Sequence, residues 1–135
     1  MDPLSIAAIT SKFVGATDCA WTLYKDCKNS SEDFQRISQE VASLHVVLKE
    51  AADLLEFGNP VDLGGKSERL MVLIQGCNDT LSDIRNLLDK YESLGTQAQR
   101  KWIRVRWGLE DLADLTRRLI SNTALLSSFN VLLAE

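Results

Sequence analysis

Three cysteines and a single histidine are the strongest candidates for chemistry in this chain of 135 residues. Nucleophilic catalysis would pair the thiol of Cys19, Cys27 or Cys77 with the imidazole of His45. It would also need a third group to orient the ring and an oxyanion site, and neither can be found in the sequence. A metal site needs several ligands, and the chain has no Cys-x-x-Cys or His-x-x-x-His pair. We therefore expect no enzyme, no metal, no cofactor and no small-molecule substrate, and we interpret His45 as a histidine at the edge of the core.

The string Gly64-Gly65-Lys66-Ser67 resembles the end of a phosphate-binding loop. The Walker pattern needs a glycine five residues before Gly65, and that position is Pro60, which lacks the N–H that such a loop directs at phosphate. The string also follows a predicted helix, where the motif requires a strand. We interpret it as a loop between helices, with Ser67 as the cap of the next helix.

A basic, tryptophan-bearing segment occupies residues 100–107. Its members are Arg100, Lys101, Trp102, Arg104, Arg106 and Trp107. Cations alternating with aromatic rings suit anionic lipid or single-stranded nucleic acid. The whole chain is acidic, however, with a net charge of −4, so we expect no nucleic-acid partner. A solvated face whose tryptophans pack inward is our main interpretation, and contact with an anionic membrane is the alternative.

The composition fits one folded domain over residues 1–135. Hydrophobic residues make up 45% and charged residues 25% of the chain, with seven glycines and two prolines. A chain of this length buries roughly two-thirds of its unfolded surface, enough for a core without disulfides. The odd number of cysteines favours reduced thiols, and no run approaches the ~18 apolar residues of a membrane span. We expect a cytoplasmic protein, with recruitment to a membrane as the alternative.

Apolar residues recur at steps of three and four along most of the chain, which predicts helices and no strands. The three clearest runs are Phe34, Ile37, Val41, Leu44, Leu48, Ala51 and Leu55; Leu70, Ile74, Cys77, Leu81, Ile84, Leu88 and Tyr91; and Leu112, Leu115, Leu119, Asn122, Leu126, Phe129 and Leu133. Asn122 falls in the third run, where we expect either a hydrogen-bonded core amide or a residue that sets the helix register.

Helix boundaries follow from caps and breakers. We predict long helices over residues 3–28, 32–57, 67–93 and 109–133, and a short basic helix that begins near Thr96 and ends at a break at Gly108. Short loops between long amphipathic helices favour antiparallel neighbours. The predicted fold is all-α, an up-and-down bundle of four long helices with a short connecting helix.

Several segments resemble the fungal N-terminal domains that precede nucleotide-binding NACHT or ankyrin-bearing NOD-like receptor proteins, a group allied to the HeLo-like domains. The likeness rests on the opening Met1-Asp2-Pro3-Leu4-Ser5-Ile6-Ala7-Ala8, the heptad Glu40-Val41-x-x-Leu44-x-x-x-Leu48, the run Cys77, Leu81, Ile84, Leu88 and Lys90, and the block from Arg100-Lys101-Trp102 to Trp107. It covers nearly the whole chain. The resemblance implies a helical signalling or effector domain without catalytic residues, the N-terminal module of a longer STAND-type receptor in immunity or programmed cell death.

Our leading hypothesis is an interaction module that binds itself or another helical domain. Off-seam hydrophobic residues are the candidate contacts, namely Val46, Val47, Met71 and Trp107, because exposed apolar patches mark partner surfaces. The alternative follows from the HeLo-like resemblance and is membrane execution by residues 3–27. In that case Leu4, Ile6, Ile9 and Phe13 enter the bilayer while Arg100, Lys101, Arg104 and Arg106 face anionic lipid.

Overall fold

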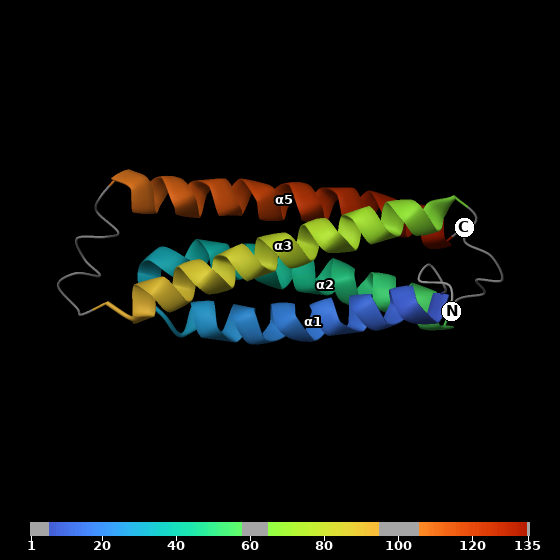
Figure 1. Cartoon of the computed structure of the whole chain (residues 1–135), viewed down its shortest axis with the longest axis horizontal. Coiled ribbons are helices and arrows are strands. Elements are labelled where there is room, and N and C mark those ends of the chain that lie inside the picture. Colours follow the sequence, from blue (N-terminus) through green and yellow to red (C-terminus); the bar gives the residue numbers. More distant parts are fainter. Residues whose placement is uncertain (1–5, 58–64, 95–105, 135) are drawn as a thin grey trace.

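Four long helices make up most of the computed structural model, which describes residues 6–57, 65–94 and 106–134 (Figure 1). They are α1 (Ile6–Lys28), α2 (Gln35–Phe57), α3 (Lys66–Glu92) and α5 (Arg106–Ala134), and a 3-10 turn, η1 (Glu32–Phe34), leads into α2. These segments contain no strand. The predicted all-α, up-and-down bundle is therefore confirmed. The predicted short helix, Leu4 and the basic residues Arg100, Lys101 and Arg104 lie outside the described residues.

Consecutive long helices run in opposite directions, but they do not all pack side by side. The close backbone contacts join α1 to α2 and α3, and join α5 to the same two helices. Around the bundle the order is therefore α1, α2, α5, α3, which places α2 and α3 on a diagonal (Figure 1). As a result α1 lies parallel to its neighbour α3, and α2 lies parallel to its neighbour α5.

Small residues explain which helices lie closest. Ala16 and Ala20 of α1 and Ala51 and Ala52 of α2 are all buried, and side chains of this size let two backbones approach closely. The α1/α2 pair is accordingly the most closely packed. The buried positions of α3 are mostly Leu and Ile, so α3 lies less close to both of its neighbours than α2 does to its own.

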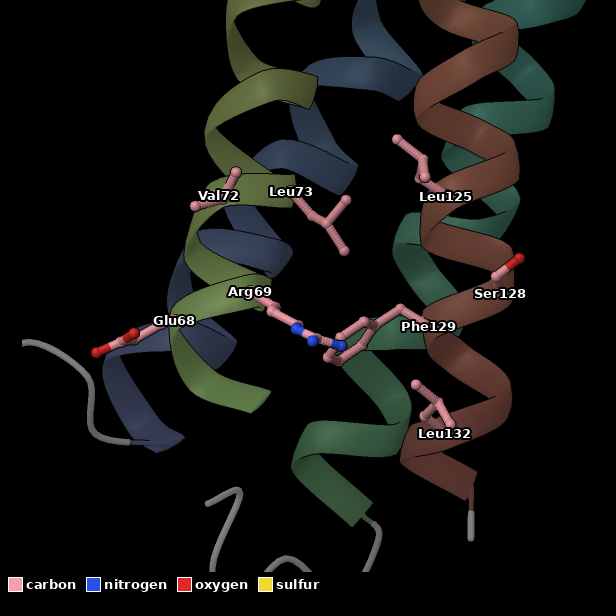
Figure 2. A pocket seen from close by; sticks show the side chains of 8 residues that line it. All are labelled: Glu68, Arg69, Val72, Leu73, Leu125, Ser128, Phe129 and Leu132. Atoms are coloured by element: carbon pink, nitrogen blue, oxygen red, sulfur yellow. The ribbon is translucent and has the colours of Figure 1, made fainter. Parts of the chain in front are cut away.

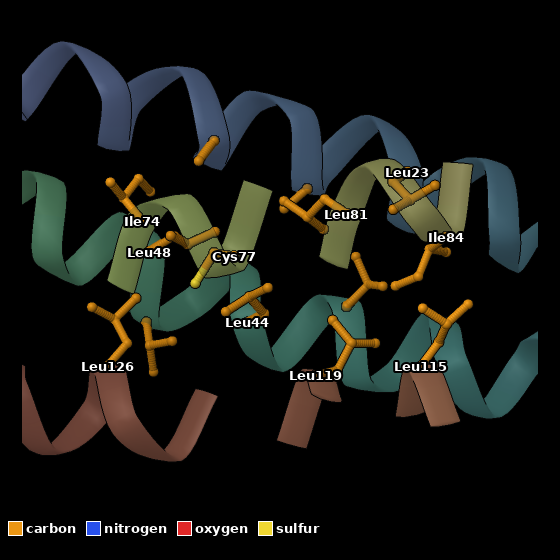
Figure 3. Close-up of a cluster of buried hydrophobic side chains, with 14 of the residues drawn as sticks. Leu23, Leu44, Leu48, Ile74, Cys77, Leu81, Ile84, Leu115, Leu119 and Leu126 are labelled. Carbon is orange, nitrogen blue, oxygen red and sulfur yellow. The ribbon is translucent and has the colours of Figure 1, made fainter. Parts of the chain in front are cut away.

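The predicted apolar seams form the core. Every residue of the first two runs is buried, and in the third run only Asn122 and Leu133 are partly exposed. Figure 3 shows side chains from all four helices meeting at mid-length, among them Leu23, Leu44, Ile74 and Leu119. The seams thus supply most of the buried hydrophobic side chains of the core.

Two predicted boundaries were wrong. Residue Gly108 lies inside α5, which begins at Arg106, so the helix is not broken there. A glycine in a helix costs only about 1 kcal/mol relative to alanine, which a long packed helix tolerates. Helix α3 begins at Lys66 with Gly65 as its N-cap residue, so Ser67 lies in the first turn instead of capping it.

Candidate interaction surface

The cysteines are all free, and two of them are buried. Burial raises the pKa of Cys27 to about 12, although nearby Arg85 opposes this shift, and burial alone raises the pKa of Cys77 to about 11. Both side chains are therefore protonated thiols at neutral pH and poor nucleophiles. Cys19 is exposed on α1.

His45 packs against an aromatic side chain of the neighbouring helix. Its ring centroid lies 5.2 Å from that of Trp21 on α1, and Trp21 in turn lies 5.4 Å from Tyr24. Burial and the charge of Lys49 lower the pKa of His45, with Asp18 acting in the opposite direction, so the ring is neutral at pH 7. The half-buried position matches the histidine at the edge of the core that we expected. Within the described segments, no group of three His, Cys, Asp or Glu side chains is arranged to hold a metal ion.

Polar side chains join α3 to α5 near the middle of the bundle. The Asn122 amide donates to Thr80 Oγ1 at 2.8 Å and to the Gly76 carbonyl at 3.4 Å. Toward the start of α5, Arg118 forms an ion pair with Asp83 at 2.8 Å. Asn122 is hydrogen-bonded as predicted, but it is only half-buried and lies at the edge of the core. The α3/α5 seam is thus held in register by polar pairs along this part of its length.

The residues predicted to form the contact surface do not lie together. Val46 is 61% exposed, but Val47 is only 9% exposed and belongs to the core. The reason is that α2 also packs against α5, where the buried Asn130 amide donates to the Val47 carbonyl at 3.1 Å. Met71 is half-buried against the core, and the side chain of Trp107, like that of Arg106, lies outside the described part of α5.

The candidate membrane residues belong to the bundle where they are described. Ile9 and Phe13 are completely buried between α1 and the other helices, and Ile6 is half-buried. None of the helices in the described segments combines the length and apolar character that crossing a bilayer requires.

A different apolar surface lies between the first turns of α3 and the last turns of α5. Here the two helices leave a groove with a volume of about 540 Å³. The residues that line it are Glu68, Arg69, Val72, Leu73, Leu125, Ser128, Phe129 and Leu132. Figure 2 shows Arg69 and Leu73 extending from α3 toward α5, where Phe129 lies opposite.

Water reaches large apolar side chains at this groove. Val72 is 72% exposed and Leu125 is 55% exposed, while Leu73 and Phe129 are shielded and form the floor. At the end of the groove the Lys66 ammonium donates to the Leu132 carbonyl at 3.2 Å. This bond satisfies a carbonyl of the last helical turn and fixes the end of α5 against the start of α3.

The exposed side of α5 beside the groove carries no charge. From Leu119 to Ala134 the sequence has no Asp, Glu, Lys or Arg. Its exposed side chains are small or apolar, and they include Ile120, Leu125, Val131 and Leu132. Solvated helix faces are usually charged, so an uncharged face beside an apolar groove is unusual for a helix that contacts only water.

One sequence signal pointed to this surface, and our sequence analysis missed it. Leu125 and Leu132 are seven residues apart on α5, off the seam that Leu119 and Leu126 define, within a stretch without charges. The groove itself depends on the spacing between α3 and α5, which the sequence pattern does not give.

Comparison of the chain with protein families, with curated proteins and with solved structures finds no match.

Proposed function

We propose that this chain is a non-enzymatic interaction module that binds an apolar helix in the groove between α3 and α5. The observation that carries the proposal is the exposure of Val72 and Leu125 at the mouth of a groove whose floor is Leu73 and Phe129. An amphipathic helix that lays its apolar face in such a groove removes these side chains from water. Burying apolar surface stabilises the complex by roughly 25 cal/mol per Å² before the costs of association are subtracted.

The candidate chemistry elsewhere in the described segments supports a binding role over a catalytic one. Cys27 and Cys77 are buried and protonated, and His45 packs against Trp21. These residues have structural roles in the core and at its edge. The groove, by contrast, exposes apolar surface that folding alone does not require.

The resemblance to fungal NOD-like receptor N-terminal domains supplies a biological setting for this proposal. In that setting the bundle is a cytoplasmic signalling module, and the receptor gathers copies of it or presents it to another helical domain. The opening residues Met1–Ala8 and the block at residues 100–107 support the assignment at the level of sequence. The groove fits it because assembly through a helical face needs an exposed apolar surface.

Membrane execution by residues 3–27 has less support. Ile9 and Phe13 would have to leave the core, and their burial helps to hold α1 on the bundle. Each fully buried side chain of this kind contributes roughly 1.5–3 kcal/mol of hydrophobic stabilisation. The corresponding test is leakage of anionic vesicles at low salt, where absence of both leakage and vesicle binding would exclude this role.

Site-specific photo-crosslinking in the cells that make the protein tests the interaction role. A photoreactive amino acid replaces Leu125 at the groove and, in a matched control, replaces Val46, which is similarly exposed on α2. We expect covalent adducts at position 125, with a second copy or another protein, that position 46 does not give. Equal labelling at both positions, or no adduct at position 125, would contradict the proposal.

A further inference from the structure

The order of the helices along the chain favours an arrangement that this bundle does not adopt. Placing α1, α2, α3 and α5 in sequence around the bundle would make all neighbours antiparallel, which suits short connections and the helix dipoles. The observed order instead places α2 beside α5 and α1 beside α3, and both of these pairs are parallel (Figure 1). The apolar seams do not distinguish the two orders, because a seam fixes only which side of a helix faces the core. Contacts outside the seams must therefore determine the observed order.

We propose that Asn130, a buried asparagine of α5, determines this order by binding the main chain of α2. Only 1% of Asn130 is exposed, and its Nδ2 donates to the Val47 carbonyl at 3.1 Å. A main-chain carbonyl cannot follow the amide by changing rotamer, so the bond forms only where α5 lies directly against α2. In the sequential order α2 and α5 would lie on a diagonal, and the amide would be buried without this acceptor. A buried polar group that loses its partner is strongly unfavourable.

Asn130 differs in this respect from another polar residue on the same flank of α5. Thr116, Thr123 and Asn130 are spaced by seven residues, so they share one flank of the helix. The Thr116 hydroxyl donates to the Leu112 carbonyl of its own helix at 2.7 Å, a bond that any neighbour of α5 would permit. Burying an amide costs free energy that burying a leucine does not. A buried asparagine that pairs with one particular neighbour therefore lowers stability but favours a single arrangement, as it does in coiled-coil seams.

The other parallel pair is also joined by a polar contact. Arg85 of α3 forms an ion pair with Asp26 of α1 at 2.7 Å. Both side chains are partly exposed, so water screens this pair and its contribution to stability is small. It still requires α1 beside α3, and the sequential order would place these two helices on a diagonal. Both polar contacts thus favour the observed order, and the contact made by Asn130 is the buried one.

A cysteine cross-link between α2 and α5 reports which order the chain adopts. Arg36→Cys and Arg117→Cys place thiols at two exposed positions that line one groove between these helices, well away from Asn130. Cys19→Ser removes the exposed native thiol, and the other two cysteines are buried. A short bismaleimide should join the two new cysteines rapidly within one chain. The diagonal placement of α2 and α5 in the sequential order should prevent this reaction.

Removing the amide should affect helix order and stability in different directions. In Asn130→Leu we expect the urea midpoint to stay the same or rise, because leucine replaces a buried polar group. The initial rate of cross-linking should fall at least about twofold, as the two orders become similarly populated. The amide NMR signals of α2 and α5 should double for the same reason. Asn130→Ala lacks the amide without adding volume and should show the same loss of cross-linking.

Leu126→Ala is the matched control, because it truncates another fully buried side chain in the same part of α5. It should lower the urea midpoint and leave the cross-linking rate of the folded chain unchanged. An unchanged rate with a single set of NMR signals in both Asn130 variants would overturn the proposal, as would an equal loss of cross-linking in Leu126→Ala. Loss of the helical fold in both Asn130 variants would also overturn it, because the amide would then be needed for folding itself and not for helix order.

Discussion

At the scale of single residues, burial decides which thiols can react. Cys19 is exposed, whereas Cys27 and Cys77 are buried, with pKa values raised to about 12 and about 11. We predict that a disulfide reagent at neutral pH modifies one thiol per folded chain rapidly and the other two only after denaturation.

The variant Cys19→Ser is the matched control for this thiol measurement. It should remove the rapid phase and leave the slow one unchanged. Rapid modification of two or three thiols in the folded chain would show that the core around Cys27 or Cys77 opens readily.

Asn122 and Thr80 form the polar contact for which the structure gives the most direct energetic test. We predict that Asn122→Ala lowers the free energy of unfolding by about 1 kcal/mol, because it removes the 2.8 Å bond to Thr80 Oγ1. Urea denaturation of both single variants and of the double variant Asn122→Ala/Thr80→Val measures the coupling. Strictly additive effects would mean that the bond contributes nothing to stability.

At the scale of helices, periodicity predicted the elements well and their neighbours poorly. Spacing alone placed two runs in the core, one from Phe34 of η1 to Leu55 of α2 and one from Leu70 to Tyr91 of α3. All of these seam residues are buried. Steps of three and four follow directly from helix geometry, so a single sequence carries this information.

The surface was harder to predict, because it depends on which helices become neighbours. A heptad pattern predicts which side of a helix is buried, but it does not predict which helix packs against that side. Val47 was assigned to the surface for this reason, since its burial requires α5 to pack beside α2. The groove was missed for the same reason. Val72 and Leu125 line one groove only because α3 and α5 are adjacent.

Helix α1 offers a prediction at this scale. Phe13 is completely buried, so Phe13→Ala leaves a cavity and should lower the free energy of unfolding by about 3–5 kcal/mol. Val14, the next residue, is partly exposed, and Val14→Ala should change stability by no more than about 0.5 kcal/mol. Urea denaturation of both variants compares them. Similar small effects would indicate that α1 is held loosely, which would favour the membrane alternative.

At the scale of the whole molecule, the four helices differ in how closely they pack against their neighbours. The α1/α2 and α2/α5 pairs are closely packed, and small residues such as Ala16, Ala20 and Ala52 allow this at the first pair. Helix α3 lies less close to α1 and α5, and its contacts with α5 include polar pairs and the open groove. Local stability in a folded protein follows such differences in packing, so α3 should be the least stable of the four helices.

This inequality predicts the order in which the bundle opens. In native-state hydrogen exchange with increasing denaturant, amides of α3 should merge into one cooperative unit at a lower free energy than amides of α1 and α2. A partner bound in the α3/α5 groove should selectively slow the hydrogen exchange of α3 amides. The reason is that it adds contacts to α3 and leaves the α1/α2 pair unchanged. A Leu125→Glu variant, which places a charge at the groove, should lose this protection by the partner. Equal protection of α3 and α2 in the dilute wild-type chain would instead show that the bundle opens as a single unit.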